Sequence, residues 1–134
     1  MNPLILDTSY LIDYFNGKYF SNDDSVENAI KEKRVYYNGI ILTELISGVR
    51  HKKDKSRMEL VLSGLTYLPL KYSDFSRAGE IRNELFKQGF SMSTPDSLIA
   101  THAKEYNLKL ITMDSFFLKA GDLIEIKVEI PTVL

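Results

Sequence analysis

Four acidic residues of this chain stand beside or inside apolar segments: Asp7, Glu44, Asp96 and Asp114. Asp7 and Asp114 follow the ends of apolar runs, Glu44 interrupts one, and Asp96 follows a proline. Carboxylate oxygens suit Mg²⁺ or Mn²⁺, and these ions lower the pKa of a bound water and offset charge that develops on a phosphate. The four acids therefore predict metal-dependent hydrolysis of phosphodiester bonds, with all four as catalytic residues and metal ligands.

Each of these acids also has a simpler structural explanation. Asp7 and Asp114 both stand where a helix cap is expected. Asp96 in a first helical turn is favoured by the helix dipole by about 0.5 kcal/mol. Glu44 is harder to explain in this way, because isoleucines precede it by one helical turn. The four together are more informative than each alone, since four acids on one sheet edge repel one another unless a cation neutralises them.

The elements that must position these acids alternate between strands and helices. Short runs rich in β-branched and aromatic residues predict five strands: Leu4–Leu6, Val35–Tyr37, Leu65–Leu70, Leu108–Thr112 and Ile124–Val128. Apolar residues with helical spacing fill segments 75–85 and 98–106, and a helix is also expected from Thr8 to Phe15. This alternation predicts an α/β fold with a central, mostly parallel sheet of about five strands and helices on both faces.

Capping residues set the expected helix boundaries. Ser73 or Asp74 is expected to open one helix and Gly89 to close it. Thr94 is expected to cap the next helix, with Pro95 at its first position. We expect flexible connections at 17–22 and 51–56, and a flexible tail at 131–134.

Length and composition limit the remaining possibilities. A chain of 134 residues is expected to form one domain, over 1–134, with a genuine core. The absence of cysteine excludes disulfides, thiolate metal sites and thiol nucleophiles. The 17 basic and 18 acidic residues nearly cancel, so nucleic acid would have to meet a local patch. No apolar run is long enough to cross a bilayer and no cationic leader is visible, so we expect a cytoplasmic protein.

One basic run and two histidines complete the candidate residues. Segment 50–57 contains five cations and one acid, and its members Arg50, Lys52 and Lys53 are candidate contacts to an RNA backbone. A solvated helix face or loop explains the same run equally well. His51 is expected to be exposed, and His102 falls on a predicted helical stripe, which favours a hydrogen-bonded core histidine over a general base.

Four short motifs in order resemble the PIN domain, especially its VapC-like toxin branch. They are Leu-Asp-Thr-Ser at 6–9, Thr-Glu-Leu-Ile-Ser-Gly at 43–48, Pro-Asp-Ser-Leu-Ile-Ala at 95–100 and Leu-Ile-Thr-Met-Asp-Ser-Phe-Phe at 110–117. The resemblance implies a three-layer α/β/α sandwich and a metal-dependent endoribonuclease whose acidic quartet is Asp7, Glu44, Asp96 and Asp114. It also implies that the hydroxyls of Thr8, Ser9 and Thr112 flank the site and contact substrate.

The same resemblance implies partners. Such toxins typically cleave a structured RNA, arrest translation, and are inhibited by a small cognate antitoxin that also binds promoter DNA; a homodimer is expected as well. Some members carry a further acid shortly after the position of Asp114, whereas Ser115, Phe116 and Phe117 stand here. A second metal is therefore expected to be held weakly.

Three other functions also use acidic residues of this kind, and the chain lacks a residue that two of them need. A phosphoacceptor receiver domain needs an acidic pair at the first strand, but Thr8 and Ser9 follow Asp7. A haloacid-type phosphatase needs a second aspartate two residues on, where Ser9 stands. A catalytically silent binding module, whose acids capture an arginine of a partner, remains the third alternative.

Overall fold

The computed structural model describes residues 2–134 and contains one five-stranded sheet in which every neighbouring pair of strands is parallel. Its strand order is β3-β2-β1-β4-β5. The strands are β1 (Leu4–Leu6), β2 (Val35–Tyr37), β3 (Thr66–Tyr67), β4 (Lys109–Ile111) and β5 (Val128–Glu129). The predicted α/β class and the number of strands are confirmed.

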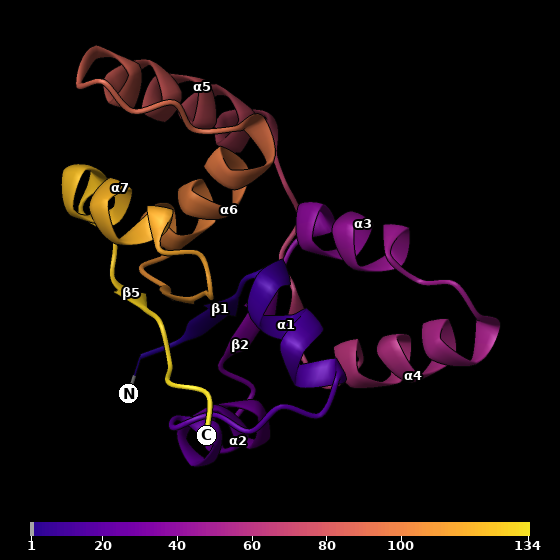
Figure 1. The fold of residues 1–134 in the computed structure, drawn as a ribbon. Helices are drawn as coiled ribbons and strands as arrows, with labels where there is room; N and C mark the ends of the chain where they lie inside the picture. Colours follow the sequence, from indigo (N-terminus) through magenta and orange to yellow (C-terminus); the bar gives the residue numbers. More distant parts are fainter. Residues whose placement is uncertain (1) are drawn as a thin grey trace.

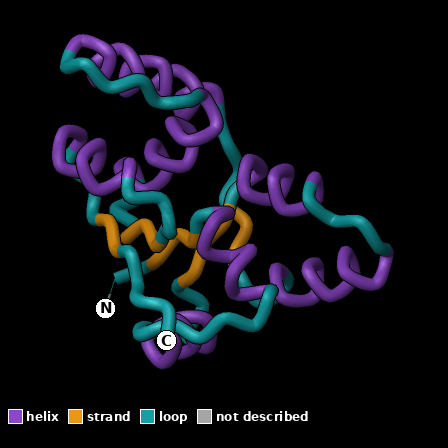
Figure 2. Tube along the Cα trace, in the orientation of Figure 1, coloured by secondary structure: helices purple, strands orange, loops and turns teal. Residues whose placement is uncertain are grey.

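Helices cover both faces of this sheet (Figure 1). They are α1 (Thr8–Phe15), α2 (Asp23–Lys31), α3 (Gly39–Ser47), α4 (Lys52–Leu62), α5 (Tyr72–Lys87), α6 (Thr94–Glu105) and α7 (Phe116–Ile124). Right-handed crossovers place the helices that precede β3 and those that follow it on opposite faces. Figure 2 shows the short strands between α2 on one side and α6 and α7 on the other, which confirms the three-layer α/β/α sandwich.

The strand order creates a natural site between β1 and β4. The chain moves from β1 to β2 and β3 in one direction, then returns to β4 on the other side of β1. The register pairs Leu6 with Ile111, so the two strands end level with each other. Ligands of open α/β sheets bind outside the carboxyl ends of strands at such a reversal point. Asp7 follows β1 there, and Asp114 comes three residues after the end of β4.

The core is built from apolar strands and the inward stripes of the helices. Ile5 and Leu110 on adjacent strands have no exposed surface, and neither do Ile81 and Ile99 on α5 and α6. Every residue of α6 from Ser97 to Ala103 is buried. This helix is therefore held on several sides, which fixes the position of its first turn at the sheet edge.

Some predicted boundaries are wrong because tertiary contacts set the ends of the elements. The predicted strand Ile124–Val128 begins as the last residue of α7, since Ile124 packs into the core and Glu125 adopts a left-handed conformation with φ 62° that ends the helix. Of the predicted strand Leu65–Leu70, only Thr66 and Tyr67 form β3, and the Leu68 N–H adds a hydrogen bond to the Tyr37 carbonyl of β2 at 2.8 Å.

The helix caps also differ from those predicted. Helix α6 is capped by Ser93, whose Oγ accepts the Asp96 N–H at 3.2 Å, and Thr94 is the first helical residue. Helix α5 begins after Lys71, whose N–H donates to the Asp74 carboxylate at 2.9 Å. Gly89, with φ 87°, follows α5 as expected.

The three segments that were expected to be flexible have defined structure. Helix α4 begins at Lys52, so most of segment 51–56 is helical and not a loop. The other two segments meet each other, because Phe20 forms a β-bridge with Val133 and the Ser21 N–H donates to the Thr132 carbonyl at 2.9 Å. Among residues 2–134, no helix is both long enough and apolar enough to cross a membrane.

Candidate active site

Asp7 is a nearly buried carboxylate, 5% exposed, at the end of β1. One of its oxygens, Oδ2, accepts two hydroxyl hydrogen bonds, from Ser9 Oγ at 2.9 Å and from Thr112 Oγ1 at 2.7 Å. Asp7 occupies the position before the first residue of α1, but its side chain makes no capping hydrogen bond. The helix-cap explanation of this acid is therefore wrong, and its carboxylate is oriented by Ser9 of α1 and by Thr112, the residue that follows β4.

The same two hydroxyls fix the loop between β4 and α7. Ser9 Oγ accepts the Met113 N–H at 3.0 Å, and Thr112 Oγ1 accepts the Asp114 N–H at 3.0 Å. Each hydroxyl has one hydrogen, which goes to Asp7, and one backbone donor from the loop. Among residues 2–134, Oδ1 of Asp7 has no hydrogen-bond partner, so that oxygen is available to a ligand.

Glu44 is held by Thr8, the residue before Ser9. It lies exposed on α3, and its Oε1 accepts a hydrogen bond from Thr8 Oγ1 at 2.7 Å. Consecutive hydroxyls in the first turn of α1 thus direct two acids from distant parts of the chain, Ser9 acting on Asp7 and Thr8 on Glu44. This arrangement explains why the motif that begins with Asp7 continues with two hydroxyl residues.

The pKa of Asp96 shows that the four acids share one region. Burial raises the pKa of this half-buried carboxyl, the Ser93 hydroxyl acts in the opposite direction, and the charges of Asp7, Asp114 and Glu44 raise it further. Asp114 is exposed, and its Oδ1 accepts the N–H of Phe116, the first residue of α7, at 3.0 Å, although Ser115 occupies the N-cap position. The charges of the three other acids thus act on Asp96, and we call the four residues together the acid edge.

The acid edge contains negative charge without a partner cation. In the part of the chain that the structure describes, none of the eight ion pairs includes Asp7, Glu44, Asp96 or Asp114. Within residues 2–134, no three acid or histidine side chains form a ready-made metal cage. Donors that are all oxygen, with one free oxygen on a firmly held Asp7, fit Mg²⁺ or Mn²⁺, because such ions keep several waters and need few protein ligands.

A buried network behind the site supports the helix that carries Glu44. Asn38 is the N-cap of α3, and its Oδ1 accepts the N–H groups of Ile40 and Ile41 at 3.1 Å each. Its Nδ2 therefore faces Nδ1 of His102 at 3.0 Å and donates to it. Nε2 of His102 then carries the proton and lies 3.3 Å from Asp74 Oδ2.

This network confirms His102 as a hydrogen-bonded core histidine, with no exposed surface. Burial lowers the pKa of His102 and outweighs Asp74, which acts to raise it, so the His102–Asp74 contact is a hydrogen bond of a neutral ring. Sequence reasoning missed the role of Asn38. An asparagine directly after a predicted strand and before an apolar helix is a typical N-cap signal that pointed to it.

The basic residues predicted to contact substrate lie away from the acids. Arg50 belongs to the connection between α3 and α4, and Lys52 and Lys53 begin α4, at the end of the α3–α4 hairpin that extends from the body of the protein (Figure 1). All three are exposed, as is His51. The Arg50 guanidinium donates to the carbonyls of Ser47 and Val49, within the same connection. Among the described residues, no hydrogen bond or ion pair joins these cations to the acid edge.

Comparison with known proteins identifies relatives over most of the chain. Residues 4–123 match the model of the PIN domain family. A protein named Ribonuclease VapC from Rickettsia bellii is 31% identical over 123 residues, which cover 84% of this chain and 85% of the relative. The range matched by the family model, residues 4–123, contains all four acids of the acid edge and both β1 and β4.

Solved structures share the fold. The chain superposes on one from VapBC2 of Rickettsia felis, a complex bound to a DNA fragment from its promoter, with a TM-score of 0.80, 25% identity, and coverage of 94% of this chain and 96% of the other. DNA-bound VapBC from Salmonella typhimurium gives a TM-score of 0.77 and 25% identity, and covers 96% of this chain and 98% of its counterpart.

Proposed function

This chain belongs to the PIN domain family, and from that premise we propose that it is a metal-dependent endoribonuclease and the toxin of a toxin–antitoxin pair. One structural observation carries the proposal. Asp7, at the point where the strand order reverses, has one oxygen that accepts two hydroxyl hydrogen bonds and one that is free, and the charges of Asp7, Glu44 and Asp114 all raise the pKa of Asp96. Similarity to ribonucleases named VapC supports RNA as the substrate.

We propose Mg²⁺ or Mn²⁺ as the cofactor. Asp7, Asp96 and Asp114 would hold the ion, which when bound lowers the pKa of a water and offsets charge on the phosphate oxygens. The hydroxyls of Ser9 and Thr112 keep Asp7 in one orientation, and such indirect contacts typically affect metal affinity or activity 10- to 100-fold. Glu44 is exposed and has Oε2 without a partner among residues 2–134, so we assign it the role of accepting a proton from an attacking water.

The experiment that tests this function compares two Asp-to-Asn variants. Asp7→Asn keeps the shape of the side chain and its ability to accept from Ser9 and Thr112, but removes the charge. We expect cleavage of RNA by the purified protein with Mg²⁺ or Mn²⁺ to fall at least about 100-fold while the fold survives. Asp122→Asn is the control, because Asp122 is an exposed acid of α7 outside the acid edge. Equal cleavage by Asp7→Asn and the wild type would contradict the proposal.

Metal binding separates the nuclease from a silent binding module. We expect calorimetric titration of Mn²⁺ into the partner-free protein to show binding that Asp7→Asn weakens. Absence of any divalent binding would favour the silent module, in which the acids capture an arginine of a partner.

We also propose a small antitoxin as a protein partner and a homodimer as the state of the chain, both within the cytoplasm. The VapBC complexes among the structural neighbours support an antitoxin. Co-expression with the product of a short adjacent reading frame, followed by light scattering of the purified species, tests both. A stable complex that no longer cleaves RNA is the expected result.

A further inference from the structure

A small pocket is lined by residues of α5 and of the segment that follows it. Figures 1 and 2 show that this segment, 88–93, runs back along α5. The pocket's volume is about 280 Å³. Its walls include Arg82, Asn83 and Phe86 from α5, and Phe90, Ser91 and Met92 from the returning segment. We call it the α5–α6 pocket. It combines a cation, two aromatic rings, an amide and a hydroxyl.

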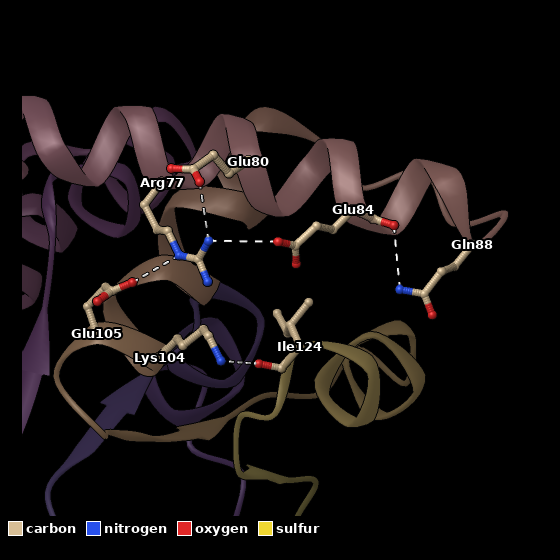
Figure 3. A network of polar contacts seen from close by, with 7 residues as sticks. All are labelled: Arg77, Glu80, Glu84, Gln88, Lys104, Glu105 and Ile124. Atoms are coloured by element: carbon tan, nitrogen blue, oxygen red, sulfur yellow. Dashed lines mark hydrogen bonds and ion pairs between the residues drawn. The ribbon is translucent and has the colours of Figure 1, made fainter.

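Arg82 is oriented by the protein yet has no acidic partner. Its Nε–H donates to the Met92 carbonyl at 2.8 Å, which fixes the guanidinium against the returning segment. Over residues 2–134, no acid pairs with it and its two terminal amino groups have no hydrogen-bond acceptor. Arg77, one and a half turns earlier on the same helix, instead contacts three glutamates (Figure 3). A guanidinium held in this way presents donors in the geometry that matches a phosphate.

The aromatic wall faces solvent and leads to the acid edge. The Phe86 side chain is 74% exposed, and Phe90 is half-buried. The Phe90 ring lies 6.4 Å from that of Phe116, whose backbone N–H donates to Asp114 Oδ1. Ser93, the cap of the helix that carries Asp96, comes three positions after Phe90, a path of about 10 Å when extended. The α5–α6 pocket is therefore the near neighbour of the acid edge.

We propose that the α5–α6 pocket is a nucleotide subsite, in which an unpaired base of an RNA strand stacks on Phe86 and Phe90 and an adjacent phosphate accepts hydrogen bonds from Arg82. This inference rests on the proposed function for its substrate class. Aromatic side chains that stack bases are the usual way to hold single-stranded RNA, and stacking tolerates any base. Asn83 and Ser91 supply hydrogen-bonding groups for the edge of the base.

The subsite also supplies a positive charge that the acid edge lacks and that a phosphate backbone needs. Four acids without a cation repel a phosphate backbone, and the chain as a whole carries a formal charge of −1. Arg82 supplies a cation that has no acidic partner among residues 2–134, on the α5 side of the site, whereas Arg50, Lys52 and Lys53 belong to the end of the α3–α4 hairpin. Binding to this subsite places the next phosphates of the strand at the acid edge.

The test measures RNA binding apart from cleavage. A fluorescent single-stranded oligoribonucleotide is titrated with the full chain in EDTA, and anisotropy gives the Kd. We expect Phe86→Ala to weaken binding about 5- to 100-fold, as loss of one stacked base does, and Arg82→Gln to weaken it and to reduce its salt dependence. Arg77→Gln is the matched control and is expected to bind like the wild type. With Mg²⁺ present, the expected effect of Arg82→Gln is a higher KM with kcat nearly unchanged.

Each outcome decides between named possibilities. Wild-type affinity in both Arg82→Gln and Phe86→Ala overturns the subsite, even if the wild type cleaves RNA. Loss of a dimer in Phe86→Ala with unchanged RNA affinity overturns it as well, because the face is then covered by a second copy. Binding that depends on Arg82 in a chain that cleaves no RNA with either metal supports the subsite and contradicts the proposed function.

Discussion

Within residues 2–134, acidic side chains gather in two regions, around Arg77 and at the acid edge, and only the first region contains a cation that pairs with them. Around Arg77, three glutamates from α5 and α6 share one guanidinium, with Glu105 at 3.1 Å from Nε, Glu80 at 3.6 Å and Glu84 at 3.9 Å from Nη1 (Figure 3). At the acid edge, no acid has a partner cation among the described residues, and hydroxyls or a backbone N–H group hold three of the four carboxylates, those of Asp7, Glu44 and Asp114. The glutamates of the Arg77 cluster therefore have their counter-charge within the chain, whereas the acids of the acid edge need one from a ligand.

This difference distinguishes charge that supports the fold from charge that serves function. An exposed ion pair contributes about 0.2–1 kcal/mol, so the Arg77 cluster adds a little to the contact between α5 and α6. Gathered like charges lower stability, and a protein keeps them where a ligand neutralises them. Substitutions at the acid edge should therefore change activity, and substitutions in the Arg77 cluster should change stability slightly.

The largest effect that sharpens this comparison is expected for Thr112→Val, which keeps the shape of a fully buried side chain and removes its hydroxyl. Asp7 Oδ2 then loses its 2.7 Å hydrogen bond, and the Asp114 N–H loses its acceptor. Because the variant misorients two acids at once, we expect RNA cleavage or Mn²⁺ affinity to fall about 10- to 100-fold. Cleavage assays and calorimetry measure the two quantities.

Thr101→Val is the matched control for this substitution. Thr101 is equally buried, but its hydroxyl donates to the Ser97 carbonyl within α6. The control should lose some stability and keep its cleavage rate. Equal losses of activity in the two variants would mean that Thr112 acts through packing and not through Asp7.

How far the sequence predicts the site depends on whether a role is local. Apolar runs that end on an acid, together with strand–helix alternation, were enough to predict the parallel sheet and the convergence of Asp7, Glu44, Asp96 and Asp114. The direction of Asp7 was not predictable, because it depends on Thr112, 105 residues away. A helix cap is the simplest local explanation of such an acid, and only the pairing of β1 with β4 removes it.

Boundaries and missed residues follow the same rule. Ile124 has strand propensity, but the core contact of α7 makes it helical. Asn38 has a local capping signal, yet its contact with His102 joins residues 64 positions apart. Arg82 carries no motif, since its importance lies in the absence of the acidic neighbours that surround Arg77 on the same helix.

A smaller effect is expected from the pH dependence of His102, which belongs to neither region. Burial lowers its pKa in the folded protein below about 6.5, its value in an unfolded chain. The folded state therefore binds this proton less readily, and its contribution to stability is complete above about pH 6.5 and is lost as pH falls. Asp74 and Lys71 are the charged groups that act on the ring, and the Tyr106 ring packs against it. The slope is at most about 1.4 kcal/mol per pH unit.

Urea denaturation at several pH values measures this dependence. His102→Gln should flatten the fall in unfolding free energy between neutral and mildly acidic pH, because the variant has no group to protonate. His51→Gln, at an exposed histidine, should keep the wild-type profile. A protonated Nδ1 of His102 would face the Asn38 amide as donor against donor, so cleavage should fall over the same pH range through loss of order in α3. Identical profiles for His102→Gln and the wild type would show that other groups cause the dependence.

The smallest effect, on stability alone, is expected for Arg77→Gln. This variant tests whether the paired charges of the Arg77 cluster serve the fold and not the activity. The variant leaves three glutamates without their shared cation, so the free energy of unfolding should fall by about 0.2–1 kcal/mol at low salt, and less at high salt because exposed charges are screened. RNA cleavage should not change. Arg82→Gln should instead reduce cleavage at low RNA concentration through a higher KM, and any stability that it loses with the hydrogen bond to the Met92 carbonyl should not depend on salt, because no ion pair is lost. If Arg77→Gln reduced cleavage as strongly as Arg82→Gln, pairing would no longer separate structural from functional charge in this protein.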